Sequence, residues 1–343
     1  MKNRTLGIMA LVFVGVIMAL ASPRHRPPGQ PGDVAELKVM IREWAVPTKG
    51  AHPHDPAVGP DGALWFTEQM VNKLGRLDPK TGEFKEYSLV EGKNSGPHGL
   101  VADNEGNIWY TANFAGFIGK LDPRTGKVTE YKMPSEKADD PHTAVFDAHG
   151  ILWFTVQGGN MVGRLDPKTG KIELKEVPTE SALPYGIQIN SKGVPVFCEL
   201  GTNKMGSIDP KTLKITEYVL AESARPRRLA IAADDSVYFT DYKSGHLGVL
   251  HMATGAVKMY ASPGGAESNP YGIAITPDGM VWYSESGVKP NTIVRFDPKT
   301  ETFARANIPS GGGVVRNMAA TRDGRVYIAC SGVDKVGVVE AAK

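Results

Sequence analysis

Three histidines in the sequence share the same preceding residue and the same spacing. His54, His98 and His142 each follow a proline and stand 44 residues apart, and Asp140 precedes the last of them by two positions. Neutral imidazole accepts protons near physiological pH and is a common metal ligand, and a nearby carboxylate adds a hard oxygen donor. Acid–base catalysis or cation binding is the chemistry that these residue types would serve.

The histidines belong to a repeat that runs through most of the chain. The first copy, "PHDPAVGPDGALWFTE", begins at Pro53, the seventh, "VRNMAATRDGRVYIAC", begins at Val315, and the steps between copies are about 42 to 45 residues. The second position of each copy holds a polar or aromatic side chain. In chain order these residues are His54, His98, His142, Tyr185, Arg227, Tyr271 and Arg316.

Each copy has the pattern of four short strands. A first strand such as "GLVA" leads through a glycine-containing turn to an aromatic strand such as "LWFT", then to a third strand, a "DPKTG" turn and a fourth strand. Four strands in about 40 to 45 residues indicate a β-propeller blade. The seventh copy lacks its fourth strand, and residues 41–47 ("IREWAVP") match it. We predict an all-β, seven-bladed β-propeller over residues 41–343, with four-stranded blades and an N-terminal strand that completes the last blade.

In such a fold the first strand of each blade lines the central channel. The seven side chains at the second repeat position are therefore expected to form a ring near one mouth of the channel. Convergent polar groups in a concavity are typical of a binding site. We predict that this ring binds substrate, and its two arginines favour an anionic or carbonyl-rich ligand.

Other interpretations of these residues stay open. The three histidines could be copies without a chemical role, or could together hold a transition metal. Four acids at the ends of second strands could pair with Arg227 and Arg316 and join blades. They are Glu68, Glu199, Asp241 and Glu285. Cys198 and Cys330 occupy alternate positions on strands of blades that are not neighbours, which argues against a disulfide.

The N-terminal segment has the features of an export signal. Residues 1–21 combine a short basic start, a 16-residue apolar run and a final Ala-Leu-Ala, and residues 22–40 begin as a Pro/Gly-rich linker. Removal of Lys2 and Arg4 from the 39 basic residues leaves 37 against 37 acidic ones, so no charge excess suggests nucleic-acid binding. We expect a periplasmic or extracellular protein with no stable membrane span after cleavage of the signal.

The repeat unit "GPDGALWFTEQMVNKLGRLDPKTGEFKEYSLV" closely resembles that of the streptogramin B lyases, also called virginiamycin B lyases, over about residues 41–340. These seven-bladed propellers open a cyclic depsipeptide lactone by elimination with a Mg²⁺ ion. Gly96-Pro97-His98 followed by Asp140-Pro141-His142 is similar to their pair of site motifs. The resemblance implies that His142 is the base, Asp140 a metal ligand and His98 a substrate contact. The further acid of the family has no counterpart here, because Val156 or Gln157 takes its place.

These observations predict a function and leave two other hypotheses. The expected activity is that of an exported carbon–oxygen lyase acting as a monomer on a depsipeptide or another small molecule, with Mg²⁺ implied by the resemblance. The alternative is an exported propeller that binds a small molecule, peptide or glycan at the channel mouth without catalysis. A metal-dependent lactonase of the related six-bladed class is a third hypothesis, against which the count of seven blades argues.

Overall fold

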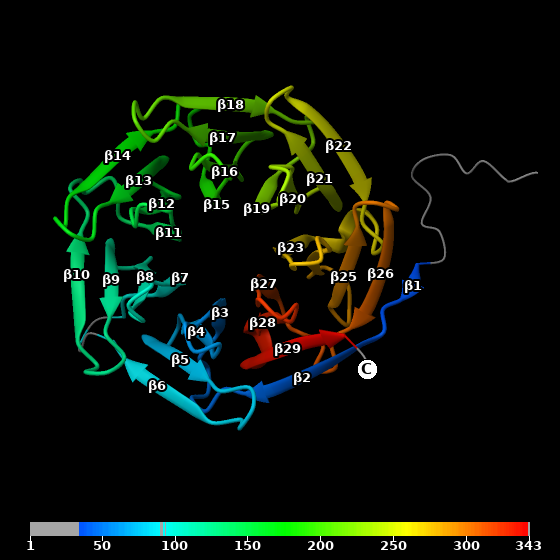
Figure 1. Cartoon of the computed structure of the whole chain (residues 1–343), viewed down its shortest axis with the longest axis horizontal. Coiled ribbons are helices and arrows are strands. Elements are labelled where there is room, and N and C mark those ends of the chain that lie inside the picture. Colours follow the sequence, from blue (N-terminus) through cyan, green and yellow to red (C-terminus); the bar gives the residue numbers. More distant parts are fainter. Residues whose placement is uncertain (1–33, 90–91, 93, 342–343) are drawn as a thin grey trace, which may run out of the picture. The chain divides into compact units, whose positions relative to one another are not determined.

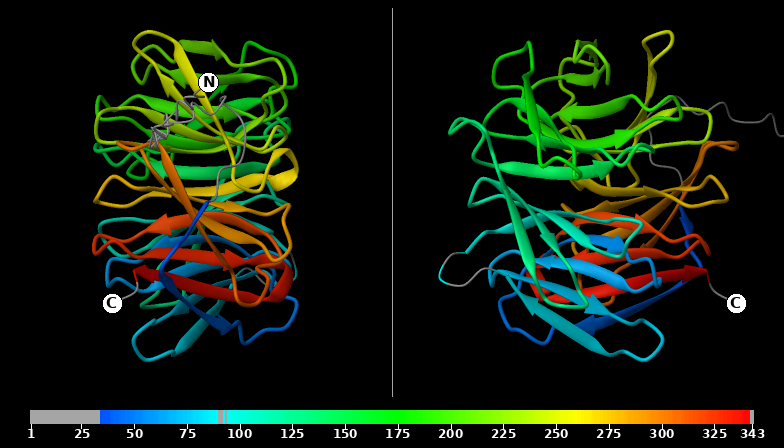
Figure 2. Two further views of the ribbon diagram at one scale, coloured as in Figure 1. Left: turned by 90° about the vertical axis from the view of Figure 1, so that its right-hand side faces the viewer. Right: turned by 60° about the vertical axis from the view of Figure 1, so that its left-hand side comes forward.

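The computed structural model describes residues 34–341 except residues 90, 91 and 93, so the predicted export signal and most of the predicted linker lie outside the described residues. Seven β-sheets surround a central channel, with the first strand of each blade innermost (Figure 1). The predicted seven-bladed propeller is therefore confirmed. Seen from the side, the blades carry loops at both faces (Figure 2).

The first four blades follow one another along the chain. Blade 1 consists of β3 (Pro53–Val58), β4 (Leu64–Glu68), β5 (Lys73–Leu77) and β6 (Phe84–Ser88). Blade 2 consists of β7 (Pro97–Ala102), β8 (Ile108–Ala112), β9 (Phe117–Leu121) and β10 (Val128–Lys132). Blade 3 consists of β11 (Pro141–Phe146), β12 (Leu152–Val156), β13 (Met161–Leu165) and β14 (Ile172–Glu176). Blade 4 consists of β15 (Pro184–Ile189), β16 (Pro195–Glu199), β17 (Lys204–Ile208) and β18 (Ile215–Val219).

The last three blades complete the ring. Blade 5 consists of β19 (Pro226–Ile231), β20 (Val237–Asp241), β21 (His246–His251) and β22 (Ala256–Ala261). Blade 6 consists of β23 (Pro270–Ile275), β24 (Val281–Glu285), β25 (Thr292–Asp297) and β26 (Thr302–Asn307). Blade 7 consists of β27 (Val315–Ala320), β28 (Val326–Cys330), β29 (Lys335–Ala341) and the N-terminal β2 (Val39–Ala45). Two short 3₁₀ helices, Ala266–Ser268 and Ser331–Val333, lie in loops.

The N-terminal strand closes the ring as predicted. β2 pairs antiparallel with β29, so that Ile41 lies opposite Val339. The propeller includes residues before residue 41, however. β1 (Ala35–Glu36) lies in the predicted linker and pairs parallel with β26 as a fifth strand of blade 6. The physical reason is Leu37, which is buried against the core and donates its backbone N–H to the carbonyl oxygen of Arg305.

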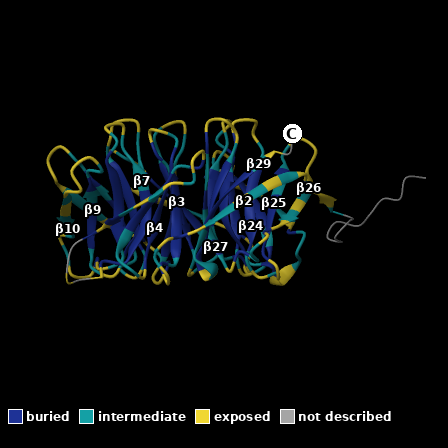
Figure 3. Ribbon diagram, turned by 90° about the horizontal axis from the view of Figure 1, so that it is seen from below, coloured by how far each residue is buried: buried dark blue, intermediate teal, exposed yellow. Residues whose placement is uncertain are grey.

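In blades 1 to 5 the core depends on an aromatic side chain facing a glycine. Phe66 on β4 lies opposite Gly75 on β5, and a Cβ atom at residue 75 would lie 2.1 Å from the Phe66 ring. The same pairing accounts for most of the glycines that punctuate the third strands of the repeat. In blade 6 Tyr283 faces Val294 instead. Burial is densest in the inner strands, and the outermost strands are partly exposed (Figure 3).

Neighbouring blades are also joined near their outer strands by a repeated hydrogen-bond pair. In each case a glutamate of an outer strand accepts hydrogen bonds from the backbone N–H and the hydroxyl of one residue in a loop. The pairs are Glu86 with Thr48, Glu217 with Thr179, and Glu43 with Ser310. Because Glu43 belongs to the N-terminal strand, this contact reinforces the closure of the ring.

Two further features bear on the predictions from sequence. Cys198 and Cys330 are both buried and free. Among the described residues, the structure contains no helix of the length and apolar character needed to cross a membrane.

Candidate active site

A β-bulge in every inner strand positions the ring of seven side chains. In blade 3, Pro141 pairs with Val156 and Ala144 pairs with Phe154, so that two residues face one between these pairs. The same register shift occurs in the other six blades. A bulge bends its strand and redirects side chains. Each ring residue is the first residue inside its bulge.

Hydroxyl groups on the second strands stabilise the bulges and connect them to the next blade. Thr155 Oγ1 accepts the backbone N–H of Thr143 at 3.2 Å and donates to the carbonyl oxygen of Tyr185 at 2.6 Å. Thr67, Thr111 and Thr240 make the equivalent pairs of bonds. This role was not predicted from the sequence. The signal was present as a Thr or Ser at the same repeat position in five of the seven copies.

The three histidines form a tilted stack with one tyrosine. Ring centroids are 3.9 Å apart between His54 and His98, 3.8 Å between His98 and His142, and 3.8 Å between His142 and Tyr185. All four side chains are buried, and His142 is 2% exposed. The rings follow the curve of the channel from blade 1 to blade 4, so they lie side by side and do not all point at one central atom.

The ring nitrogens of the histidines have specific partners. His98 Nδ1 lies 3.1 Å from the carbonyl oxygen of His142, which can only accept, so Nδ1 of His98 carries the proton. His54 Nδ1 donates to Asp55 Oδ1 at 2.9 Å. His142 Nδ1 lies 2.9 Å from Thr143 Oγ1. In each ring Nδ1 is thereby engaged within the protein.

Burial keeps the three imidazoles neutral. It lowers the pKa of His54, His98 and His142 well below the usual value of 6.5. Positive charge adds to this effect. Arg316 is the largest charged contributor that lowers the pKa of His54, and Arg228 lowers the pKa of all three.

A second set of residues crosses the channel directly behind the ring. Arg228 of blade 5 donates from Nη2 to Asp55 Oδ1 of blade 1 at 2.8 Å and from Nη1 to Thr143 Oγ1 of blade 3 at 3.0 Å. Asn317 of blade 7 donates to Asp55 Oδ2 at 3.0 Å. Four blades are therefore tied together across the channel. This network was not predicted from the sequence, although its members directly follow ring residues in the chain.

One of the remaining ring residues, Arg227, is surrounded by three tyrosine rings. The guanidinium carbon of Arg227 lies 3.8 Å from the centroid of the Tyr271 ring, 4.2 Å from that of Tyr242 and 5.0 Å from that of Tyr185. Its Nη2 donates to the Tyr185 hydroxyl at 3.2 Å, and this hydroxyl also contacts the Tyr271 hydroxyl. Arg316 lies 6.0 Å from the Tyr271 centroid. The structure thus brings all seven predicted ring residues together.

Asp140 lies apart from this hydrogen-bonded ring. Its carboxylate accepts the backbone N–H of Gly158 at 2.5 Å and that of Gly159 at 3.3 Å. Burial raises the pKa of Asp140, and the two N–H bonds oppose that increase. Across the sheet, Pro141 pairs with the apolar Val156. Asp140 therefore orders the loop between β12 and β13.

The four acids of the second strands do not pair with the ring arginines, so that hypothesis is wrong for the described residues. Glu285 accepts bonds from Ser262, Gly264 and Thr292 and lies 3.9 Å from Arg305. Asp241 accepts the backbone N–H groups of Arg225 and Ser244. Glu68 and Glu199 are buried, and burial raises their pKa values to about 8 and about 7.

One group of possible metal ligands occurs in the described part of the chain. Donor atoms of His54, Asp55 and His98 lie within 4.8 Å of one another. Asp55, however, already accepts bonds from His54, Arg228 and Asn317. A cation there would also face the Arg228 guanidinium. The cross-channel network therefore explains why these three side chains lie close together.

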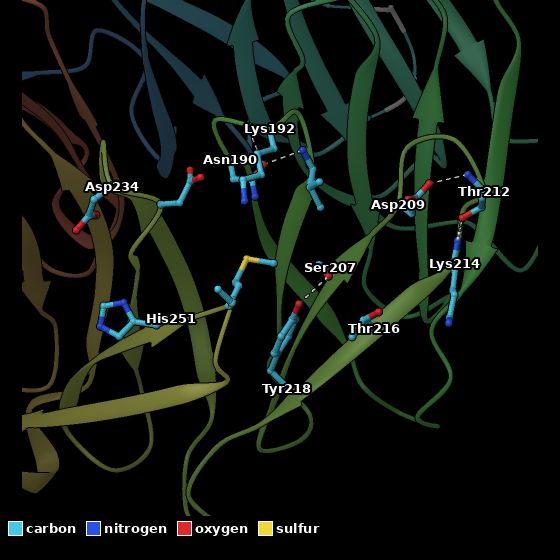
Figure 4. Close-up of a pocket in the computed structure, with 14 residues that line it drawn as sticks. Asn190, Lys192, Ser207, Asp209, Thr212, Lys214, Thr216, Tyr218, Asp234 and His251 are labelled. Atoms are coloured by element: carbon cyan, nitrogen blue, oxygen red, sulfur yellow. Dashed lines mark hydrogen bonds between the residues drawn. The ribbon is translucent and has the colours of Figure 1, made fainter.

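Among the described residues, the cavities away from the ring bring together no comparable set of side chains. A cavity of about 530 Å³ lies between blades 4 and 5, at the ends of the inner strands remote from the ring (Figure 4). Several of its polar side chains bond within their own loops or to a neighbouring strand, as His251 does with Ser236 and Tyr218 with Ser207. A second cavity, of about 430 Å³, lies in the channel below the ring, where Asp55, Thr143 and Asn317 meet apolar residues of the inner strands.

Comparison with known proteins places this geometry in a family. A solved structure of a streptogramin B lyase matches with a TM-score of 0.81 and 25% sequence identity, covering 89% of this chain and 98% of that one. Virginiamycin B lyase from Staphylococcus aureus matches with a TM-score of 0.80 and 22% identity, covering 89% and 100%. A catalytically inactive histidine-to-alanine variant of that enzyme, solved with quinupristin, matches equally well.

The family model agrees with the structural matches over nearly the whole described chain. The model of the virginiamycin B lyase family matches residues 30–263 and 197–342, two overlapping segments that together include every blade. The match is consistent with the repeat, the blade count and the Pro-His motifs at the ring. This chain is a member of the virginiamycin B lyase family.

Proposed function

We propose that this protein is a carbon–oxygen lyase that opens an ester or lactone by elimination, in a cyclic depsipeptide or a related small molecule. The observation that carries the proposal is His142, a neutral imidazole held in the ring of a chain that belongs to a lyase family. The inactive histidine-to-alanine variant of the S. aureus relative supports a histidine as the base.

The proposed step consumes no water. His142 takes a proton from the carbon α to a carbonyl group, and the neighbouring β carbon carries the ester oxygen. The electrons of that C–H bond form a C=C double bond, and the bond from the β carbon to the ester oxygen breaks. The products are an unsaturated fragment and a carboxylate, joined in one chain if the substrate was a ring. His142 then returns its proton to solvent or to the product.

Hydrogen bonding prepares His142 for this role. If its Nδ1–H donates to Thr143 Oγ1, the lone pair lies on Nε2, and Nε2 is the atom that accepts the proton. Thr143 is in turn held by Arg228, which fixes the orientation of the imidazole. His98 and Tyr185 pack against its two sides. We assign the six other ring residues to substrate binding. They are His54, His98, Tyr185, Arg227, Tyr271 and Arg316.

Magnesium stays a prediction from the family resemblance. Asp140 uses its carboxylate for two backbone N–H bonds, and Val156 or Gln157 stands where a second acid would be needed. Mg²⁺ prefers several oxygen ligands in octahedral geometry. The residues present do not fit the ion well, and the proposed step does not depend on it.

Ligand binding without chemistry is the second candidate function. It is favoured by the burial of His142, which is 2% exposed, whereas Arg227 and Arg316 are only partly buried. A small molecule, peptide or glycan at the channel mouth would then contact the arginines without reaching the base. For either function we propose an exported, monomeric protein with no nucleic-acid partner, because the propeller leaves little unpaired sheet edge.

Mass spectrometry separates these functions. The chain without residues 1–21 is incubated with a cyclic depsipeptide lactone, and the product is followed by mass and by absorbance of the new double bond. Elimination leaves the mass of the opened ring unchanged, whereas hydrolysis adds one water. Loss of turnover is expected for His142→Ala. The matched control is His149→Ala, because His149 lies in an exposed turn of the same blade.

Two results would contradict the proposal. Turnover by His142→Ala at the wild-type rate would show that His142 is not the base. Recovery of every lactone and ester tested without cleavage, together with measurable binding of the same molecules, would favour the non-catalytic function.

A further inference from the structure

We infer that Arg227 and Arg316 form a subsite for the carboxylate that the elimination releases. The inference rests on the proposed function and deepens it, because it assigns the part of the substrate that each side of the ring holds. The acidic proton would lie toward His142, and the acyl half of the ester toward the two arginines.

The charges in the channel are unbalanced. Three guanidinium groups, those of Arg227, Arg228 and Arg316, act on His54 from this region. Arg228 pairs with Asp55 at 2.8 Å. Within the described ranges, neither Arg227 nor Arg316 has a carboxylate at ion-pair distance. Two positive charges are therefore left without an anion at the mouth of the channel.

Part of each free guanidinium is also unsatisfied. The Nε atoms of Arg227 and Arg316 are buried and have no hydrogen-bond partner in the structure. An unpaired buried donor costs free energy, and more when it is charged. A ligand oxygen that accepted these N–H groups would recover that free energy. Guanidinium binds carboxylate through two parallel bonds, which suits such a ligand.

The arginines are well placed relative to the proposed base. Tyr185 connects them, because its ring packs 3.8 Å from the His142 ring and its hydroxyl accepts Arg227 Nη2 at 3.2 Å. Arg227 and Arg316 both lie against the Tyr271 ring. One side of the site thus presents a proton acceptor and the other presents positive charge.

This arrangement suits the charge that elimination develops. As the C–O bond breaks, negative charge builds on the ester oxygens, and preorganised donors there lower the barrier. A cation such as Mg²⁺ would supply comparable stabilisation. Because the second acidic ligand is absent here, the two guanidinium groups provide positive charge that does not depend on a metal.

Equilibrium binding tests the subsite without relying on turnover. Calorimetry is carried out with His142→Ala protein and phenylacetate as a mimic of the released acid, with phenylacetamide as its neutral counterpart and inorganic phosphate as a second anion. We expect phenylacetate to bind and phenylacetamide not to bind. Phosphate binding as tight as that of phenylacetate would show a general anion site, which overturns the assignment to carboxylate.

Variants locate the site. Arg316→Gln should weaken phenylacetate binding roughly 10- to 100-fold, and Arg316→Lys should weaken it less because the charge is kept. Arg124→Gln is the matched control, since Arg124 is 76% exposed on an outer turn and pairs with Asp122. A thermal melt of each variant identifies unfolded protein. Unchanged phenylacetate binding in folded Arg316→Gln overturns the inference.

The two proposals fail in different ways. Phenylacetate binding that requires Arg316, in a protein that cleaves no ester, would leave the subsite in place and remove the lyase function. Eliminative cleavage that is equally fast in wild type and Arg316→Gln, with no inhibition by phenylacetate, would leave the lyase function and remove the subsite.

Discussion

Arg228 of blade 5 and Asp55 of blade 1 meet across the channel with their side chains 2.8 Å apart, although 173 residues separate them in the chain. Both side chains are almost completely buried. The same carboxylate orients His54, and the same guanidinium holds Thr143 beside His142. This pair therefore links the closure of the propeller to the geometry of the proposed catalytic residue.

Removal of one partner of this pair should destabilise the protein strongly. Asp55→Ala leaves the Arg228 guanidinium buried without an anion, a change that typically costs about 3–5 kcal/mol. Chemical denaturation followed by intrinsic fluorescence measures the loss. Asp122→Ala is the control, because it removes only a surface pair with Arg124 and one turn hydrogen bond, and should cost much less. Equal effects of the two substitutions would contradict the structural role of the buried pair.

The buried acid Glu68 should make stability fall as pH rises. Burial raises its pKa from 4.5 to about 8, so the folded state binds this proton more tightly than the unfolded state. The stabilisation is complete below pH 4.5 and is lost progressively as pH rises toward 8. Thermal melts of wild type and Glu68→Gln at a series of pH values measure it.

The expected result is a difference that depends on pH. Glu68→Gln should match wild type near pH 4.5 and exceed it in melting temperature near pH 8, because the amide has no proton to lose. The exposed Glu176 provides the control, and Glu176→Gln should shift the melting temperature equally at both values. If Glu68→Gln raised the melting temperature by the same amount at every pH, the raised pKa of Glu68 would be disproved.

Thr155 should support the site because its hydroxyl hydrogen-bonds to backbone groups of two inner strands. Thr155→Val removes the hydroxyl that accepts from Thr143 N–H and donates to the Tyr185 carbonyl, leaving two buried backbone groups unpaired at a cost of about 1–3 kcal/mol. Thr155→Ser keeps the hydroxyl and should lose less. Denaturation gives the stability, and the rate of lactone opening gives the effect on His142. A serine variant as unstable as the valine variant would point to packing and not to the hydrogen bonds.

Asp140 offers a direct test of magnesium dependence. If its role is to cap the Gly158 and Gly159 N–H groups, Asp140→Ala should lower stability by about 0.5–2 kcal/mol, and neither EDTA nor added Mg²⁺ should change turnover of wild type. A metal role predicts the opposite result. Turnover would stop with EDTA and return with Mg²⁺, and the Asp140→Ala variant would lose that response.

The sequence by itself determined the propeller, because its information is local and repeated. Alternating strands, turn residues and a step of about 42 to 45 residues define a blade. The fourth strand that the seventh copy lacks was predicted at residues 41–47, and the structure has it at Val39–Ala45. The same register identified all seven ring residues, since equivalent repeat positions must lie at equivalent places around a closed ring. The short strand at Ala35–Glu36 was not predicted, because two residues carry too weak a pattern.

Only the tertiary structure decided which side chains meet. The bulges and the curvature of the channel, neither visible in the repeat pattern, turn His54, His98 and His142 into a stack. The pairing of Arg228 with Asp55, which leaves Arg227 and Arg316 without an anion, arises when blades 1 and 5 face each other across the closed ring. Sequence periodicity specifies the level of a residue along the channel. Which side chain that residue contacts depends on ring closure and side-chain packing, which involve residues far apart in the chain.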